Sequence, residues 1–76
     1  GFASFIIIKN NKPWMIVETK FKNNKSISPH LYYFQNQLQT EYALQVVIDM
    51  DYVDTSCFVG PAPLIVPAKT FLSQLV

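Results

Sequence analysis

The chain has 76 residues, a length that fits one domain near the lower limit at which a single core is stable without disulfides or metals. Half of the residues are hydrophobic, which excludes an intrinsically disordered chain. The six lysines and five acidic residues nearly balance, and the absence of arginine argues against tight autonomous DNA binding. Because only 14% of the residues are charged, we expect another protein surface to cover part of the apolar surface.

A single cysteine, Cys57, excludes an intramolecular disulfide and is typical of a protein in a reducing cytoplasm. Its neighbours Ser56 and Phe58 supply no cation that would activate the thiol, so we expect it to be buried and inert. No apolar run approaches the roughly 20 residues of a membrane span, and there is no secretory signal. These features predict a cytoplasmic protein with no membrane partner.

The N-terminal third predicts an antiparallel β-hairpin. Residues 5–8 and 14–21 are rich in strand-forming side chains. Between them Asn10 and Asn11 tolerate the positive φ angles that a tight hairpin turn requires. Trp14 begins the second strand, and we expect it to pack on a face of the sheet.

A helix is expected next, with Ser28 as its N-cap and Pro29 at its first position, extending to about residue 39. Apolar residues at 31, 34 and 38 give it one buried stripe. Because Tyr32, Tyr33 and Phe34 are consecutive, we expect two of these three rings to face the sheet or a neighbour. His30, the only histidine, has no metal-ligating residues at a suitable spacing, so a surface or capping role is favoured.

The second half predicts a strand at residues 43–48, short strands at 57–59 and 64–66, and a terminal helix at 67–75. A strand, a crossover helix and a further strand imply that the strands at 14–21 and 43–48 are parallel. The predicted fold class is therefore α/β with an α+β-like order: a β-hairpin, a helix crossover to a parallel strand, short further strands and a C-terminal helix. Residues 1–76 form a single domain.

Glu18 and Lys20 are the strongest candidates for chemistry. In a strand they emerge on the same face, about 7 Å apart. A carboxylate there can hold Mg²⁺, and the adjacent ammonium can orient a water molecule and stabilise charge on a phosphate. The alternative interpretation is an ordinary ion pair at the end of a strand.

The ordered set of segments resembles the PD-(D/E)XK, or restriction-endonuclease-like, superfamily, and most closely the C-terminal nuclease-like domain of certain prokaryotic AAA-type ATPases of unknown function. The resemblance rests on the hairpin that ends in Glu18-Thr19-Lys20 and on later segments in the same order. These are Ser28-Pro29, Tyr33-Phe34, Gln45-Val46-Val47 and Pro67-Ala68-Lys69-Thr70-Phe71-Leu72. It implies a truncated restriction-endonuclease-like core at the C-terminus of a larger ATPase. It also implies catalytic roles for Glu18 and Lys20, with Glu18 as a metal ligand.

One departure from the superfamily concerns the second metal ligand. The resemblance places an acidic residue at the start of the first strand, and here that position holds Ser4. A neutral hydroxyl is a poor ligand for Mg²⁺, so the site is expected to be degenerate, with Glu18 and Lys20 as remnants. The other candidate acids, Asp49 and Asp51, are expected in a solvated loop.

Three functions follow from these observations. The first is an accessory interaction domain appended to an ATPase, with a decayed nuclease site, no firmly bound cofactor and the ATPase domain as a partner. The second is an active Mg²⁺-dependent DNA nuclease that uses Glu18 and Lys20. The third is an oligomerisation module unrelated to nucleic acid. Exposed apolar strands predict a homodimer, with residues 5–8 and the terminal helix carrying Phe71, Leu72 and Leu75 at its interface.

Overall fold

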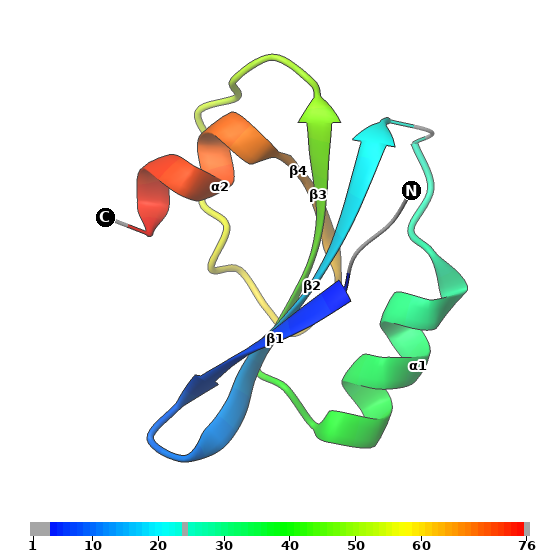
Figure 1. Ribbon diagram of the computed structural model, residues 1–76, viewed down its shortest axis with the longest axis vertical. Coiled ribbons are helices and arrows are strands. Elements are labelled where there is room, and N and C mark those ends of the chain that lie inside the picture. Colours follow the sequence, from blue (N-terminus) through cyan, green and yellow to red (C-terminus); the bar gives the residue numbers. More distant parts are fainter. Residues whose placement is uncertain (1–3, 24, 76) are drawn as a thin grey trace.

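The N-terminal hairpin forms one edge of a four-stranded mixed sheet (Figure 1). The structure is a computed structural model that describes residues 4–23 and 25–75. Strand β1 (Ser4–Lys9) pairs antiparallel with β2 (Lys12–Lys22). Asn10 and Asn11 have φ angles of 54° and 64°, so the predicted turn chemistry is confirmed.

The rest of the chain alternates between the sheet and its two faces. Helix α1 (Pro29–Leu38) leads to β3 (Tyr42–Asp49), and a long loop leads to β4 (Leu64–Pro67) and α2 (Ala68–Gln74). The strand order is β1-β2-β3-β4, and β3 is parallel to both β2 and β4. The predicted parallel crossover is therefore confirmed, and the fold is α+β.

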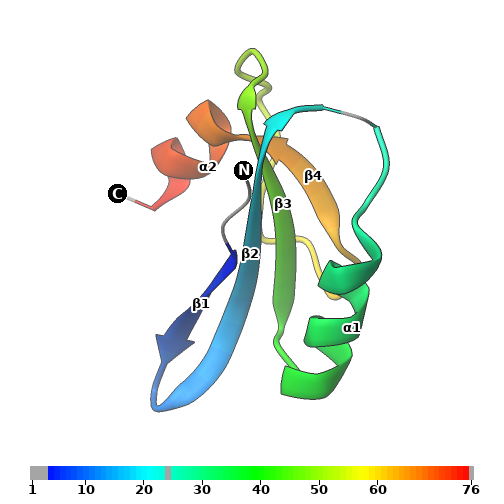
Figure 2. The same ribbon diagram turned by 45° about the vertical axis from the view of Figure 1, so that its right-hand side comes forward.

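The two helices cover opposite faces of the sheet (Figures 1 and 2). On the α1 face, Leu31 packs against Ile16 and Ala43. The face toward α2 holds the larger core, in which Phe71 and Cys57 close over the strands. Buried members from the strands are Met15, Val17, Leu44, Val46 and Val66. Within the described residues, neither helix has the length and apolar character needed to cross a membrane.

Helix α1 begins as the sequence predicts. The Ser28 hydroxyl accepts a hydrogen bond from the backbone N–H of His30 at 3.3 Å, and Pro29 occupies the first turn. The helix ends where Gln39 adopts a left-handed conformation, with φ of 54°. His30 is exposed, in agreement with the surface role expected for it.

Two sequence-based expectations about the elements are wrong. Residues 57–59 form no strand, because the backbone N–H of Cys57 donates to the side chain of Gln74 on α2 and not to a neighbouring strand. Of the short further strands, only β4 forms. All three rings at residues 32–34 are at least 43% exposed, because α1 contacts the sheet mainly through Leu31 and the half-buried Leu38.

The expectation that Phe71 lies at a homodimer interface is also wrong. Its side chain is only 4% exposed and belongs to the core on the α2 face, so it is not available for an interface. Its neighbours Leu72 and Leu75 are exposed. The difference arises because α2 turns Phe71 toward the sheet and Leu72 toward solvent.

Gly60 lies where the loop before β4 passes over the start of β3. A Cβ atom at this position would lie 2.6 Å from the Glu41 carbonyl oxygen and 2.9 Å from Cδ1 of Tyr42. Because the nearer atom belongs to the backbone, Gly60→Ala is expected to lower the free energy of unfolding by about 1–3 kcal/mol. Urea titration followed by circular dichroism measures this change.

Val59→Ala is the control, because Val59 is the exposed neighbour and its truncation creates no clash. It should change the free energy of unfolding by less than about 0.5 kcal/mol. Equal stability of Gly60→Ala and wild type would contradict the close approach of this loop to β3.

Candidate functional site

Ser4, Glu18 and Gln45 form a row across three neighbouring strands. The register pairs Ser4 with Glu18 between β1 and β2, and Glu18 with Gln45 between β2 and β3. Residues paired directly across a sheet point to the same face, so all three lie on the face that α1 covers. The hairpin register thus places Ser4 against Glu18.

Glu18 and Lys20 lie on this face two residues apart along β2. The Lys20 Nζ atom is 3.9 Å from Oε1 of Glu18, and the two side chains are 15% and 7% exposed. At this separation the contact is an ion pair without a short hydrogen bond. The predicted proximity of the carboxylate and the ammonium is therefore confirmed.

The second carboxylate oxygen of Glu18 is unusual. Oε2 is buried and accepts no hydrogen bond from any residue that the structure describes. Buried carboxylate oxygens are normally hydrogen-bonded, and exceptions often mark functional positions. Packing alone therefore does not explain a carboxylate at position 18.

Gln45 organises the loop above this row. Its side chain is fully buried, and its Nε2 donates to the Ser26 carbonyl at 2.8 Å. Its Oε1 accepts from the backbone N–H of Ser28 at 2.9 Å. Because Ser28 is the N-cap of α1, the N-terminus of that helix is held beside the Glu18 row, where its dipole favours a negative charge.

Sequence reasoning did not assign this role to Gln45. The signal was present, since Gln45 is the only polar residue inside the otherwise apolar stretch at residues 43–48. A single amide in a strand covered on both faces must find hydrogen-bond partners. Which backbone groups it binds depends on a loop that lies 17 to 19 residues earlier in the chain.

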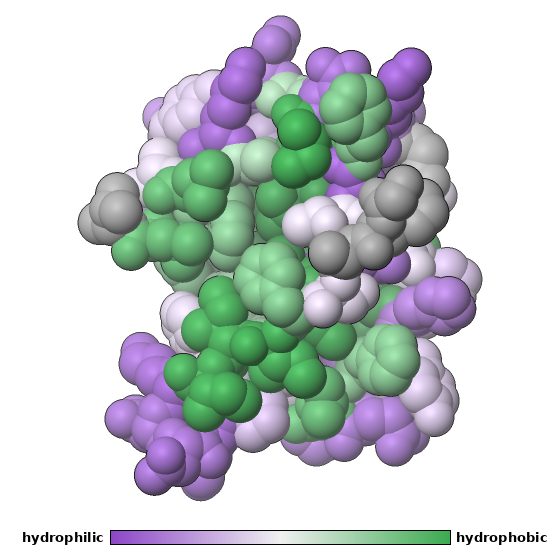
Figure 3. Space-filling model, viewed as in Figure 1, coloured by the Kyte–Doolittle hydropathy of each residue, from purple (hydrophilic) through white to green (hydrophobic). Residues whose placement is uncertain are grey.

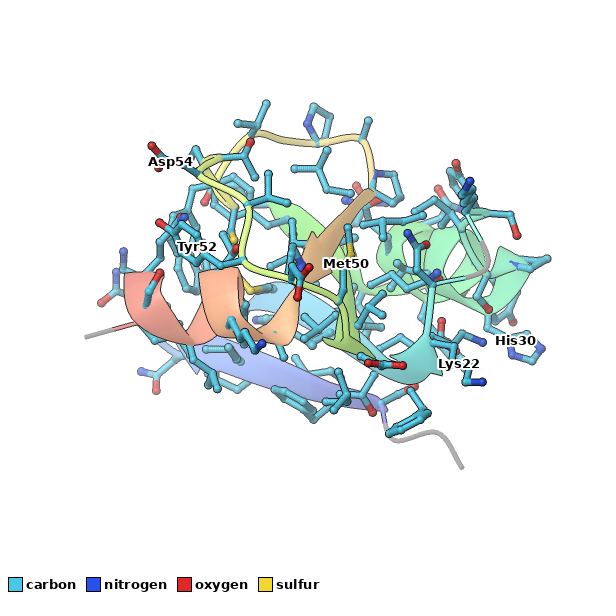
Figure 4. The ribbon with its side chains drawn as sticks, turned by 90° about the horizontal axis from the view of Figure 1, so that it is seen from above. Lys22, His30, Met50, Tyr52 and Asp54 are labelled. Carbon is cyan, nitrogen blue, oxygen red and sulfur yellow. The ribbon has the colours of Figure 1, made fainter. Side chains whose placement is uncertain are left out.

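The remaining polar candidates do not join Glu18. Asp51 is exposed in the loop after β3, as expected, whereas Asp49 is exposed but is the last residue of β3, where it pairs with Lys22 of β2. Figure 4 looks onto this end of the molecule, where His30 and Asp54 project from opposite sides. Among the described residues no group of three or more His, Cys, Asp or Glu side chains could hold a metal ion.

Cys57 is not a reactive thiol. Its side chain is fully buried in the core on the α2 face, and burial raises the pKa of the thiol above its usual value. The thiol is therefore protonated and shielded at neutral pH.

The comparisons with known proteins assign the chain to no family: no protein-family model matches it, and no curated protein and no solved structure is significantly similar to it. The chemistry of the site therefore has to be judged from its own residues. Glu18 is a poor match for a divalent cation, because Lys20 offsets its charge and Ser4, the residue paired with it on β1, carries only a neutral hydroxyl.

Proposed function

We propose that this chain is an interaction domain with a degenerate PD-(D/E)XK-type site, appended to an ATPase. The observation that carries the proposal is the pairing of Ser4 with Glu18. In the PD-(D/E)XK superfamily, which this sequence resembles, the second acidic metal ligand occupies the position that Ser4 has here. A hydroxyl there leaves Glu18 as the single carboxylate of the row.

The electrostatics of Glu18 support the same conclusion. Hard divalent cations are held by several charged or carbonyl oxygens, and sites with one carboxylate retain the ion weakly. The contact with Lys20 further reduces the negative potential at Oε1. The composition favours a surface for protein partners, because the domain exposes many large apolar side chains and carries few charges.

Restoring the missing acid tests the proposal directly. Wild-type protein is expected to bind Mg²⁺ or Mn²⁺ with a dissociation constant weaker than micromolar, and Ser4→Asp is expected to tighten binding at least about tenfold by adding a second carboxylate opposite Glu18. Isothermal titration calorimetry measures both constants.

Ser73→Asp is the matched control, because it adds the same charge on α2, against the other face of the sheet. It should leave metal affinity at the wild-type value. Micromolar or tighter binding by the wild type would overturn the degenerate-site proposal, and an unchanged affinity in Ser4→Asp would show that Ser4 does not replace the acid.

An active Mg²⁺-dependent nuclease is the second candidate, favoured by the buried and unpaired Oε2 of Glu18. Plasmid DNA incubated with the domain and Mn²⁺ distinguishes the two. We expect no cleavage above buffer. Cleavage by the wild type that is lost in both Glu18→Gln and Lys20→Met would establish the nuclease instead.

A further inference from the structure

The two edges of the sheet are protected to very different degrees. The β4 edge is four residues long and ends in Pro67, and both features discourage pairing with another strand. The β1 edge is six residues long, contains no proline, and has its single charge at the last residue, Lys9. Natural proteins usually blunt such an edge with lysine, proline or a covering element. Among the residues that the structure describes, β1 pairs only with β2, so its outer edge offers a place for strand addition.

Apolar surface extends from this edge to both flanking helices. Figure 3 shows hydrophobic residues gathered over β1 and continuing onto α2. On the other side, a groove of about 190 Å³ runs between β1 and α1. Its lining is almost wholly apolar: Ser4, Phe5, Ile6, Ile16, Phe34 and Leu38.

We propose that the β1 edge pairs antiparallel with the β1 edge of a second copy of this chain, which joins two sheets into one of eight strands. This inference rests on the proposed function, that of an interaction domain. It adds that the partner of the domain is a second copy of the same chain. A two-fold axis perpendicular to the sheet relates the copies, so each face of the sheet continues as the same face in the second copy.

This symmetry restricts the register of the pair. Opposed residues must point to the same face, so their positions must both be even or both be odd. With Ile6 opposite Ile6, Ser4 lies opposite Ile8, and Phe5 lies opposite Ile7. The alternative centre at Ile7 would place Phe5 against Lys9, which is less favourable than an apolar neighbour.

The groove beside Ser4 gives this register a specific contact. Ile8 pairs with Pro13 of β2 and is still 58% exposed. In the Ile6-centred register, Ile8 of the second copy lies against Ser4, at the mouth of the groove. Because serine is small, it leaves room for the isoleucine side chain. The symmetry makes the same contact twice.

Charge and area are both compatible with this pairing. The two copies of Lys9 fall at opposite ends of the ladder, roughly 20 Å apart, which exceeds the Debye length of about 8 Å at physiological salt. Large apolar side chains on β1, on α1 and on or directly after α2 are between 42% and 60% exposed, among them Phe5, Ile6, Ile8, Tyr33, Phe34, Leu72 and Leu75. They offer roughly 700 Å² per copy, close to the ~800 Å² per partner of a standard interface.

Light scattering coupled to size exclusion gives the first test. At tens of micromolar, the wild type is expected to have twice the monomer mass of 8.7 kDa. Ile8→Lys places a charge at the interface twice and is expected to raise the dimer dissociation constant at least about thirtyfold. The matched control is Ile48→Lys at the end of β3, which is 50% exposed and away from the β1 edge.

Cross-linking tests the register without adding charge. Antiparallel pairing brings the two Cβ atoms of residue 6 to about 5 Å, so Ile6→Cys should form a covalent dimer on mild oxidation. Ile48→Cys should not, and the buried Cys57 serves as the background. If Ile8→Lys fails to fold, the wild-type mass and this cross-link decide the proposal.

Three results would overturn the pairing: a wild-type monomer at high concentration, a dimer that Ile8→Lys leaves intact, or the absence of a cross-link at residue 6. None of them bears on metal affinity. The proposed degenerate site fails only on the calorimetric and cleavage tests, so the two failures are distinguishable.

Discussion

Phe71→Glu is expected to unfold the domain or to lower its stability by at least about 4 kcal/mol, whereas Leu72→Glu, one residue further along α2, is expected to leave it folded. Phe71 is 4% exposed in the core with Met15 and Val66, and Leu72 is 60% exposed. Burying an unpaired carboxylate and removing the ring together cost at least about 4 kcal/mol. A domain of this length has a total stability of roughly 4–11 kcal/mol.

Thermal unfolding followed by circular dichroism measures both variants. Phe71→Glu should show no cooperative transition, or one shifted down by more than about 15 °C. Leu72→Glu should keep a cooperative transition, because Leu72 is 60% exposed and lies outside the core of its own chain. A cooperative wild-type transition in Phe71→Glu would mean that α2 does not close this face of the sheet.

Gln45→Ala is expected to be the most destabilising change among the polar residues. It removes the hydrogen bonds that the Gln45 side chain donates to the Ser26 carbonyl and accepts from the Ser28 N–H, and it creates a cavity in β3. Together these effects should lower the free energy of unfolding by roughly 3 kcal/mol, which corresponds to a fall in Tm of roughly 15 °C. Urea and thermal denaturation measure the two quantities.

Two further variants separate the causes. Gln45→Met keeps the side-chain volume and loses the hydrogen bonds, so it should lie between Gln45→Ala and the wild type. Gln37→Ala removes an exposed amide on α1 and should change stability by less than about 0.5 kcal/mol. If Gln45→Met were as stable as the wild type, the hydrogen bonds to the loop would contribute nothing net.

The local elements were predictable because their signals lie within a few residues of one another. The Asn10-Asn11 turn, the Ser28-Pro29 helix start and the apolar run in β3 each follow from backbone preferences or hydrophobic periodicity. The missed feature at residues 57–59 lacked such a signal. A short apolar run forms a strand only where an unpaired edge is available, and here Gln74 of α2 takes the Cys57 N–H instead.

The candidate site was only partly predictable. Glu18 and Lys20 lie on one strand, so a period of two was enough to place them on the same face. The contribution of Gln45 could not be predicted, because its partners Ser26 and Ser28 lie in a loop whose path depends on how α1 packs. The aromatic residues at 32–34 were placed wrongly for the same reason, since α1 meets the sheet over a narrow stripe.

The sequence by itself determined the hairpin, the starts of both helices, the parallel crossover and the nearness of Glu18 to Lys20, because each depends on short-range geometry. Tertiary structure alone decided that Ser4 lies opposite Glu18, that Phe71 is buried while Leu72 is exposed, and that β1 is an edge strand of the described sheet. These properties depend on strand register and on which face each helix covers. Both are set by contacts between segments far apart in the chain, which no local pattern encodes.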